Sequence, residues 1–483
     1  MPLSRRQALQ LGGLGLAGGL VGGCAAAPTG SDPGGAADLL RFDDPLIGRI
    51  EAARQRSGQS VTAAIRAAPA TVDLGGAVVE TWAYQDQVPG PVLRARAGDE
   101  LTVTLRNDLP EPTTIHWHGL RLRNDMDGVP DMTQDPVAPG SEFRYTFTVP
   151  DPGTYFFHSH VGLQLDRGLA GVLIIDDPDD PGDVDAEWVV VLDDWADGID
   201  GATPATVYQD LQQSTGGMMG SGMDVNYPYY LVNGKVSADA ETFNAQPGDR
   251  IKLRIINAGA DTTFRCALSE HRLRLTHKDG VPVAPVDTDA VVVSMGERYD
   301  AVVTVGDGAF ALVAAAEGKA GEVRAVLRTS AAAAVPPATR DYAELSGEVL
   351  YGGQLTGLPD TPGYALDGDP DQTLELTLGV ARGGYTWLIN NVTYAEADPF
   401  VVTHGETFRV RMRNASHALH PMHLHGHTLC LDEGGSWQDT ILMPNMATIT
   451  AVAVADNPGR WAVHCHNAFH MEAGMMGMLG YRV

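Results

Sequence analysis

The sequence has few cysteines, few basic side chains and no long apolar run outside its N-terminal segment. Only four of 483 residues are cysteine, too few for the disulfide framework that holds many small exported domains together. Cys266 and Cys430 can either form one bridge or remain as two buried free thiols. Lys and Arg total 33 against 61 Asp and Glu, so the surface should repel nucleic acid and attract cations. No interior stretch of about 20 apolar residues predicts a membrane-spanning helix.

The N-terminal segment has the pattern of an export signal. Residues 4–24 read SRRQALQLGGLGLAGGLVGGC, and the paired Arg5 and Arg6 before an apolar stretch are typical of the twin-arginine type. The end of this segment, LVGGC, resembles a bacterial lipobox. In that case a lipid on Cys24 would anchor the protein in the cell envelope, on the outer face of the cytoplasmic membrane. The alternative is plain secretion after cleavage near Ala27.

Three segments of the chain align without gaps. They read AGDELTVTLRN (97–107), PGDRIKLRIIN (247–257) and HGETFRVRMRN (404–414). Each has Gly, an acidic residue, alternating apolar positions and a final Asn, and an alternation of period two predicts a half-buried strand. A spacing of about 150 residues suits whole domains. The sequence therefore predicts an all-β protein with three homologous β-sandwich domains.

This repeat divides the chain into an N-terminal signal, a tether, three domains and a linker. The tether, rich in Gly, Ala and Pro, is expected to be flexible. The expected ranges are 1–24 for the signal, 25–69 for the tether and N-terminal extension, 70–180 for the first domain, 185–330 for the second, 331–369 for the linker and 370–483 for the third.

Histidine pairs follow the repeat in the first and third domains. HWHG (116–119) and HLHG (423–426) begin nine residues after the final Asn, and HSH (158–160) and HCH (464–466) follow on a later strand. Residues two apart on a strand share a face, and random placement would give only about 0.5 His-x-His pairs in this chain. These pairs therefore predict metal ligands.

The middle domain lacks these histidines. It has Cys266 and Leu268 at the positions of the first pair, and Val313 and Ala315 at those of the second. We therefore expect it to be a spacer.

A further group of residues identifies the metal. Imidazole suits Zn, Cu, Fe and Ni alike, so the eight paired histidines do not select one. Cys465, His470 and Met475 follow in HCHNAFHMEAGM (464–475), and His420 precedes the pair of the third domain. A His₂Cys set with an axial thioether is the blue-copper electron-transfer arrangement. Cys465 would pass its electron along the strand to the adjacent His464 and His466.

At these motifs the chain resembles the multicopper oxidase family, of the exported actinobacterial copper-resistance and laccase-like type. HWHG, HSH, HPMHLHGH and HCHNAFHMEAGM match its four copper-binding signatures in order, and the resemblance covers about residues 70–483. It implies three cupredoxin-like Greek-key domains, four copper ions and reduction of O₂ to water. By position, the implied ligands are His420, Cys465 and His470 with axial Met475 for type 1 copper; His116 and His423 for type 2; and, for the type 3 pair, His118, His158 and His466 on one ion and His160, His425 and His464 on the other.

Two further sites follow less directly from the sequence. The resemblance implies a carboxylate near the cluster at Asp127, a candidate proton relay; the alternative is a turn residue before Gly128. Met218, Met219 and Met223 offer soft ligands for Cu(I), although a flexible Gly/Met loop would have the same composition.

The expected function is oxidation of Cu(I), Fe(II) or phenols coupled to four-electron reduction of O₂, with a role in copper detoxification. A general laccase that acts mainly on phenols is the alternative. Two readings from other classes fit less well. A copper nitrite reductase usually has two cupredoxin domains and lacks four His-x-His pairs, and a copper-free structural relative would have lost ligands.

Overall fold

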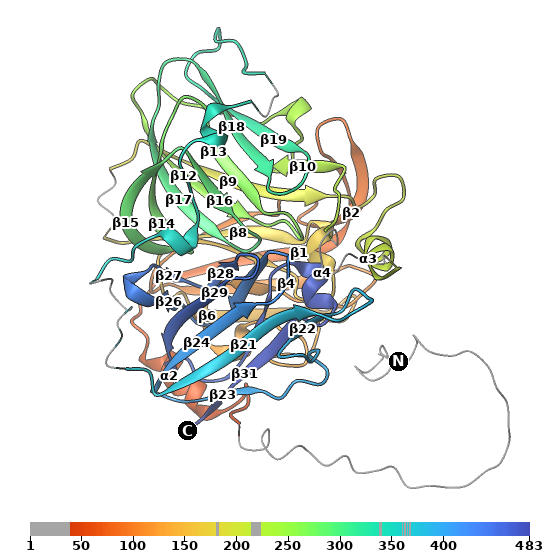
Figure 1. Cartoon of the computed structure of the whole chain (residues 1–483), viewed down its shortest axis with the longest axis vertical. Coiled ribbons are helices and arrows are strands. Elements are labelled where there is room, and N and C mark those ends of the chain that lie inside the picture. Colours follow the sequence, from red (N-terminus) through yellow and green to blue (C-terminus); the bar gives the residue numbers. More distant parts are fainter. Residues whose placement is uncertain are drawn as a thin grey trace, which may run out of the picture. The chain divides into compact units, whose positions relative to one another are not determined.

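The computed structural model describes residues 39–179, 183–213, 224–337, 341–359, 361, 364, 366 and 369–483 (Figure 1). The expected export signal, Cys24 and the three methionines Met218, Met219 and Met223 lie outside these residues. Among the described residues there is no helix whose length and apolar character would suit a membrane span.

Strands pack as pairs of sheets in three successive parts of the described chain. The sheets of the first domain have the orders β2-β1-β4-β6 and β3-β8-β7-β5. Their strands are β1 (Ser60–Asp73), β2 (Val78–Tyr84), β3 (Val92–Arg96), β4 (Glu100–Asn107), β5 (His116–His118), β6 (Glu142–Thr148), β7 (Gly153–His158) and β8 (Ala170–Asp176).

The middle domain, green in Figure 1, has the sheet orders β10-β9-β12-β17-β14-β15 and β11-β19-β18-β13-β16-β20. Its strands are β9 (Ala186–Trp195), β10 (Tyr229–Val232), β11 (Thr242–Asn244), β12 (Arg250–Asn257), β13 (Phe264–Leu268), β14 (Leu273–Lys278), β15 (Val281–Thr288), β16 (Ala290–Val293), β17 (Arg298–Thr304), β18 (Ala309–Ala316), β19 (Glu322–Arg328) and β20 (Val349–Leu350).

The third domain, blue in Figure 1, has the orders β22-β21-β24-β29-β26-β27 and β23-β31-β30-β25-β28. Its strands are β21 (Gln372–Val380), β22 (Trp387–Ile389), β23 (Phe400–Thr403), β24 (Thr407–Asn414), β25 (His420–Leu424), β26 (Leu429–Leu431), β27 (Trp437–Gln438), β28 (Thr440–Met443), β29 (Thr448–Val454), β30 (Arg460–Cys465) and β31 (Met476–Arg482). The described helices are α2 (Pro45–Ala53), α3 (Pro204–Gln213) and α4 (Ala468–Glu472), with short 3₁₀ turns η1 (Asn124–Met126), η2 (Gln164–Arg167), η4 (Ser237–Asp239), η5 (Ala343–Ser346), η6 (Gly352–Gln354) and η7 (Asp432–Gly434).

One pattern of strand pairing occurs in all three domains. The first strand of each domain runs parallel to the repeat strand, as β1 with β4, β9 with β12 and β21 with β24. In the second sheet, β3 pairs in parallel with β8, β11 with β19 and β23 with β31. Parallel neighbours need a crossover connection, so the chain forms the same Greek-key sandwich three times. The predicted all-β cupredoxin-like fold is confirmed.

The final Asn of each repeat ends its strand and fixes the loop that follows. All three are fully buried. Each side-chain oxygen accepts a 2.9 Å hydrogen bond from a backbone N–H two residues later, and each amide group donates to carbonyl groups of neighbouring loops. In the first and third domains this loop leads to the strand that carries the first histidine pair. The three residues are Asn107, Asn257 and Asn414.

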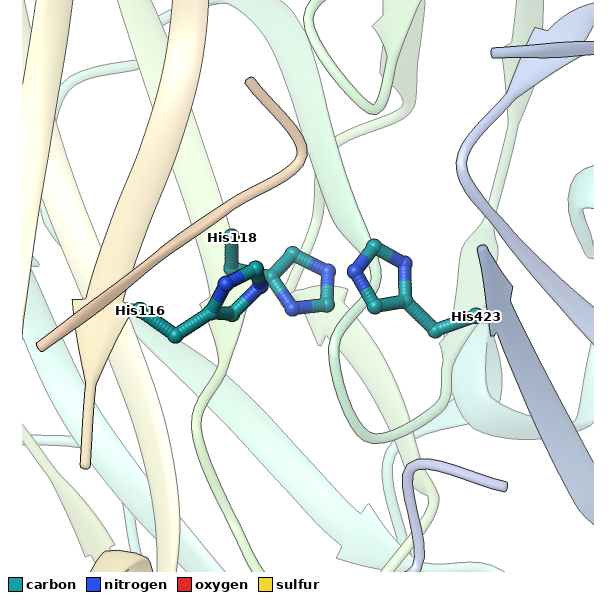
Figure 2. Close-up of side chains that lie close together, drawn as sticks. All are labelled: His116, His118 and His423. Atoms are coloured by element: carbon teal, nitrogen blue, oxygen red, sulfur yellow. The ribbon is translucent and has the colours of Figure 1, made fainter. Parts of the chain in front are cut away.

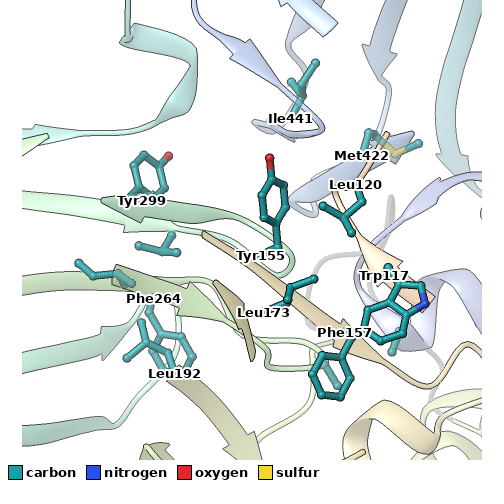
Figure 3. Close-up of a cluster of buried hydrophobic side chains, with 14 of the residues drawn as sticks. Trp117, Leu120, Tyr155, Phe157, Leu173, Leu192, Phe264, Tyr299, Met422 and Ile441 are labelled. Atoms are coloured by element: carbon teal, nitrogen blue, oxygen red, sulfur yellow. The ribbon is translucent and has the colours of Figure 1, made fainter. Parts of the chain in front are cut away.

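The hydrophobic core explains which way the histidines face. Trp117 lies between His116 and His118 on β5 and is fully buried, with its ring centroid 5.4 Å from that of Phe157 (Figure 3). Because side chains alternate along a strand, burial of Trp117 in the core turns both histidines to the opposite face. The same cluster contains residues of the other two domains, such as Phe264 and Met422.

Three elements lie within ranges expected to be outside the domains. The range 25–69, expected to be the tether and N-terminal extension, contains α2, which Asp44 caps through the N–H of Leu46, and the start of β1 at Ser60. The expected linker 331–369 contains β20, which pairs with β16 of the middle domain.

The three cysteines in the described part of the chain are not bridged. Cys266 and Cys430 are both free thiols, as is Cys465. Cys266 is buried in β13 and Cys430 is half-buried in β26. The reading as two free thiols therefore holds, and the alternative of one bridge is wrong.

Candidate metal centres

Strand pairing places the histidines of the first and third domains in matching positions. His116 on β5 lies opposite His158 on β7, and His423 on β25 lies opposite His464 on β30. The pairs His116/His118 and His423/His425 each share one face of a strand or its immediate end. Each domain therefore supplies one half of a histidine cluster.

The two halves meet in the interior. Two rings of the first domain stack on two rings of the third, His116 on His425 and His118 on His423, each with centroids 3.8 Å apart. Figure 2 shows His116 and His118 on one side and His423 facing them from the other. The groups of three whose ligating atoms lie within 4.8 Å of one another are His116, His118 and His423; His118, His158 and His466; and His160, His425 and His464.

The ring nitrogens of this cluster suit metal ions. One nitrogen of several rings donates to a backbone carbonyl at 2.9 Å: His116 to Asp127, His158 to Ser159, His423 to Asp439 and His464 to Cys465. The opposite nitrogens of His116, His158 and His423 are buried without a hydrogen-bond partner among the described residues. Such groups are costly to leave unsatisfied, whereas a metal ion would satisfy them, and the carbonyl bonds fix the ring orientation as in metal sites.

The cluster histidines are also in the protonation state that binds metal. Burial first, and then the neighbouring imidazoles, lower the pKa of these rings. That of His464 falls to about 3. Neutral imidazole is the metal-binding form, so the rings are ready to ligate at neutral pH. The rings concerned are His118, His158, His160, His425, His464 and His466.

A second group lies at the end of β30. The Sγ atom of Cys465 is 3.6 Å from Nδ1 of His420 and 3.7 Å from Nδ1 of His470. Ser416 accepts a hydrogen bond from Nε2 of His420 at 2.8 Å, which turns Nδ1 towards the sulfur. Met475 is fully buried, and its carbonyl accepts from the N–H of Cys465 at 3.1 Å. A thiolate, two imidazoles and a nearby thioether are the blue-copper donor set.

The strand that joins the histidine cluster to the Cys465 group ends one residue before the end of the expected HCH segment (464–466). β30 ends at Cys465, and His466 follows it, with its N–H donating to the carbonyl of Pro421 at 2.7 Å. Asn467 then caps α4 by accepting from the N–H groups of Phe469 and His470. His464 and His466 contact the cluster while Cys465 points to the second group, so three consecutive residues join the two sites.

Asp127 lies at the cluster and at a turn. Its Oδ2 accepts from Nδ1 of His425 at 2.9 Å, and its Oδ1 is 3.2 Å from Nδ1 of His116. It also ends η1 before Gly128, where φ is +83° and an added Cβ would lie 1.8 Å from the carbonyl oxygen of Ile115. Both expected roles are therefore compatible with its position.

Two further residues at the cluster, Asp439 and Arg298, have no signal in the sequence patterns. The guanidinium of Arg298 binds both carboxylate oxygens of Asp439 at 2.7 Å, and both residues are buried. Burial acts to raise the pKa of Asp439, but Arg298 and hydrogen bonds hold it well below its usual range. Arg298 belongs to the middle domain, which is therefore more than a spacer. Sequence spacing could not pair two residues from different domains.

The first domain has polar residues in place of the blue-copper donors. They form a buried triad in which Gln164 Oε1 accepts from the hydroxyls of Thr113 and Ser159, both at 2.7 Å. Hydrogen bonds therefore hold this site together where the third domain has a possible metal set. Counted from the repeat Asn and the His-x-His strand, Thr113, Ser159, Gln164 and Leu169 occupy the positions of His420, Cys465, His470 and Met475.

Comparison with known proteins agrees with this geometry. Three family models described as "Multicopper oxidase" match residues 66–180, 186–334 and 367–482. Multicopper oxidase MmcO of Mycobacterium tuberculosis is 42% identical over 97% of this chain and 95% of its own length. Copper resistance protein A of Escherichia coli is 28% identical over 84% and 90%. The crystal structure of laccase from Botrytis aclada superposes with a TM-score of 0.75 at 25% identity, covering 89% of each chain.

Proposed function

Because this chain belongs to the multicopper oxidase family and is a copper-binding oxidoreductase that uses O₂, we propose that its clustered side chains hold four copper ions in two centres. With copper bound, the first centre would accept one electron at a time from a small donor, and the second would supply the four-electron reduction of O₂ to water. The observation that carries the proposal is the meeting of two half-clusters of histidine, with unpartnered nitrogens, beside a separate Cys–His₂ group.

The proposed ligands follow the groups that lie together. His420, Cys465 and His470, together with the nearby thioether of Met475, would hold type 1 copper. His116 and His423 hold type 2 copper, since their unpartnered Nε2 atoms point away from the carbonyl groups that fix their rings. The type 3 pair is held by His118, His158 and His466 on one ion and by His160, His425 and His464 on the other.

The protein side chains have three tasks around these ions. When bound, copper supplies the one-electron transfers and the reduction of O₂. Cys465 joins the centres through the backbone it shares with His464 and His466. Asp127 accepts from Nδ1 of His425 and is fully buried, so its carboxyl group lies where it can pass protons towards the cluster. Burial of all the rings keeps bulk water out.

We propose that the preferred donors are Cu(I) and Fe(II), with phenols accepted less well. The net charge of −28 attracts small cations, an axial thioether favours a moderate potential and hence easily oxidised donors, and a relative bears the name copper resistance protein A. Similarity to a laccase supports the alternative, a general phenol oxidase. A role in copper detoxification follows from the first preference.

Steady-state kinetics with Cu(I), Fe(II) and a dimethoxyphenol test the donor. The copper-loaded protein should give the highest kcat/KM with a metal ion. A higher kcat/KM with the phenol would establish the laccase alternative instead. Elemental analysis of the same sample should give about four copper ions per chain, as expected for one His₂Cys site and a three-metal cluster; fewer than two after reconstitution would contradict the ligand assignment.

We also propose that the protein is exported and held at the membrane by a lipid on Cys24. The motif in residues 4–24 supports this location. Cell fractionation of the native host should find the protein with membranes and a Cys24→Ser variant in the soluble extracellular fraction. Equal distribution of the two would indicate plain secretion.

A further inference from the structure

A loop of the middle domain contacts the histidine cluster. This loop, residues 294–297, joins β16 to β17. At Gly296, where φ is +84°, an added Cβ would lie 2.9 Å from a ring carbon of His466 and 3.0 Å from one of His118. The backbone of the domain without histidine ligands therefore forms part of the wall of the cluster.

Arg298, the first residue of β17 after this loop, contacts all three domains. The guanidinium of Arg298 binds Asp439 of the third domain through two hydrogen bonds of 2.7 Å and donates from Nε to the carbonyl of Thr154 in the first domain at 3.1 Å. Its own N–H donates to Asp279 at 2.9 Å. Asp279 in turn accepts from the N–H groups of Asp439 and Thr440, at 3.2 and 3.0 Å. Arg298 is itself fully buried, so its fork is held rigidly.

Two hydrogen-bonded paths lead from Asp439 to the cluster. Its carboxylate accepts from the hydroxyl of Thr440 at 2.9 Å, and that hydroxyl accepts from Nε2 of His118 at 3.1 Å. Its carbonyl accepts from Nδ1 of His423 at 2.9 Å. The nitrogens left facing the cluster, Nδ1 of His118 and Nε2 of His423, have no partner among the described residues. The outward bonds therefore decide which nitrogen of each ring can ligate.

From this geometry we infer that Arg298 of the middle domain is a positioning residue for the O₂-reducing cluster, acting through Asp439 and Thr440 on the rings of His118 and His423. The guanidinium matches a carboxylate with two parallel hydrogen bonds, so it fixes both the place and the rotation of Asp439. The inference rests on the copper assignment proposed above.

The test compares Arg298→Met, Arg298→Lys and a matched control, Arg254→Met. Arg254 forms a second buried ion pair in the same sheet, with Asp300, and contacts the same Thr154 of the first domain, but not the cluster. Loss of the outer partner of a metal-binding histidine weakens metal affinity by about 10- to 100-fold. After dialysis against a copper chelator, Arg298→Met should therefore lose cluster copper at about tenfold lower chelator concentration than the wild type.

Spectroscopy separates positioning from general damage. Arg298→Met should keep the blue absorption of the Cys465 site while the electron paramagnetic resonance signal of type 2 copper changes. Arg298→Lys should show copper retention and a type 2 signal between those of Arg298→Met and the wild type. An ammonium group keeps the charge but cannot bind both oxygens of Asp439 in one plane. Arg254→Met should lower the melting temperature and leave copper retention and the type 2 signal unchanged.

Further outcomes overturn the inference. If both Arg298 variants retain copper as the wild type does and show an unchanged type 2 signal, the Arg298–Asp439 ion pair does not position the cluster. If Arg254→Met loses as much copper as Arg298→Met, the Arg298–Asp439 ion pair affects copper binding only through the stability of the protein. If Arg298→Met does not fold, Arg298→Lys decides, since it keeps the buried positive charge and removes only the two parallel hydrogen bonds to Asp439. A wild-type sample that binds no copper would refute the proposed function itself, which is a separate result.

Discussion

At the scale of single residues, hydrogen bonds orient several of the metal-binding rings. His116 and His423 each donate from one nitrogen to a backbone carbonyl group and leave the other nitrogen unpartnered. At the second centre, Ser416 accepts from Nε2 of His420. Rings held in this way are oriented before a metal arrives, which lowers the entropic cost of binding.

Replacing Cys465 and His118 separately should distinguish the two centres. Cys465→Ser removes the thiolate, so the absorption expected at about 600 nm and O₂ consumption should both disappear, while the cluster still binds copper. His118→Ala should keep the blue band and stop O₂ consumption. Optical spectra and an oxygen electrode measure both, and normal turnover by His118→Ala would refute the cluster assignment.

Asp127→Asn tests the proton relay. The amide fits the same space and the turn before Gly128, but it has no acidic proton to give. General acid catalysis contributes at least about 100-fold, so kcat should fall by about that factor while copper content and the blue band stay unchanged. A variant with full kcat would leave Asp127 only its role in the turn.

The sequence indicated which candidate metal-binding side chains lie together, but not the residues that support them. Cys465 and its neighbours follow from strand periodicity, because residues i and i+2 share a face whatever surrounds them. The link from Arg298 to Asp439 depends on how two domains pack, which no local pattern records. Asp127 lies between these cases, since its position at a turn was readable and its contact with His425 was not.

At the scale of strands and loops, equivalent positions of the first and third domains carry different groups of side chains. Where the third domain has His420, Cys465 and His470, the first has a hydrogen-bonded triad centred on Gln164. The period-two pattern predicted the repeat strands correctly, and β4, β12 and β24 all end at the repeat Asn. It missed the start of β1, because the alternation in SVTAAIRAAPATVD involves mostly alanine, which marks a buried face only weakly.

Gln164→Leu should destabilise the first domain through this triad. The substitution leaves the buried hydroxyls of Thr113 and Ser159 without their shared acceptor, and each unsatisfied buried group costs about 1–3 kcal/mol. Urea unfolding of the copper-free protein measures the loss. Ser159→Ala together with Gln164→Leu should be less than additive, because one of the stranded hydroxyls is then absent; full additivity would show that the triad is not a unit.

At the scale of the whole molecule, the active centre belongs to all three domains. The first and third supply histidines in equal halves, and the middle domain supplies Arg298 and the close approach of Gly296. The sequence indicated the sharing between the outer domains, since neither has enough ligands alone. It could not indicate the contribution of the middle domain, which lacks histidines at the matching positions.

Acid should destabilise the copper-free protein. Burial lowers the pKa of His420 and His464 from 6.5 to about 3, so these rings stay neutral in the folded state and take up a proton on unfolding. Stability is therefore complete above pH 6.5 and falls as the pH drops towards 3, by about 1.4 kcal/mol per pH unit for each such group. Melting temperatures at pH 7.5 and pH 5 measure the effect, and equal values would contradict it. Bound copper should raise both melting temperatures and leave the difference in place, because the rings are neutral in the folded state with or without it.

The division of the cluster between distant parts of the chain also sets an order in time. Ribosomes add about 5–20 residues per second, so the roughly 260 residues between the two sets of histidines take from about a quarter of a minute to nearly a minute to make. During that interval the first domain can fold and present four imidazoles with nothing opposite them. An ion that bound then would have an incomplete set of donors and could be exchanged readily. We therefore expect copper to be inserted after translation, when the third domain has folded and completes the set of ligands around the metal.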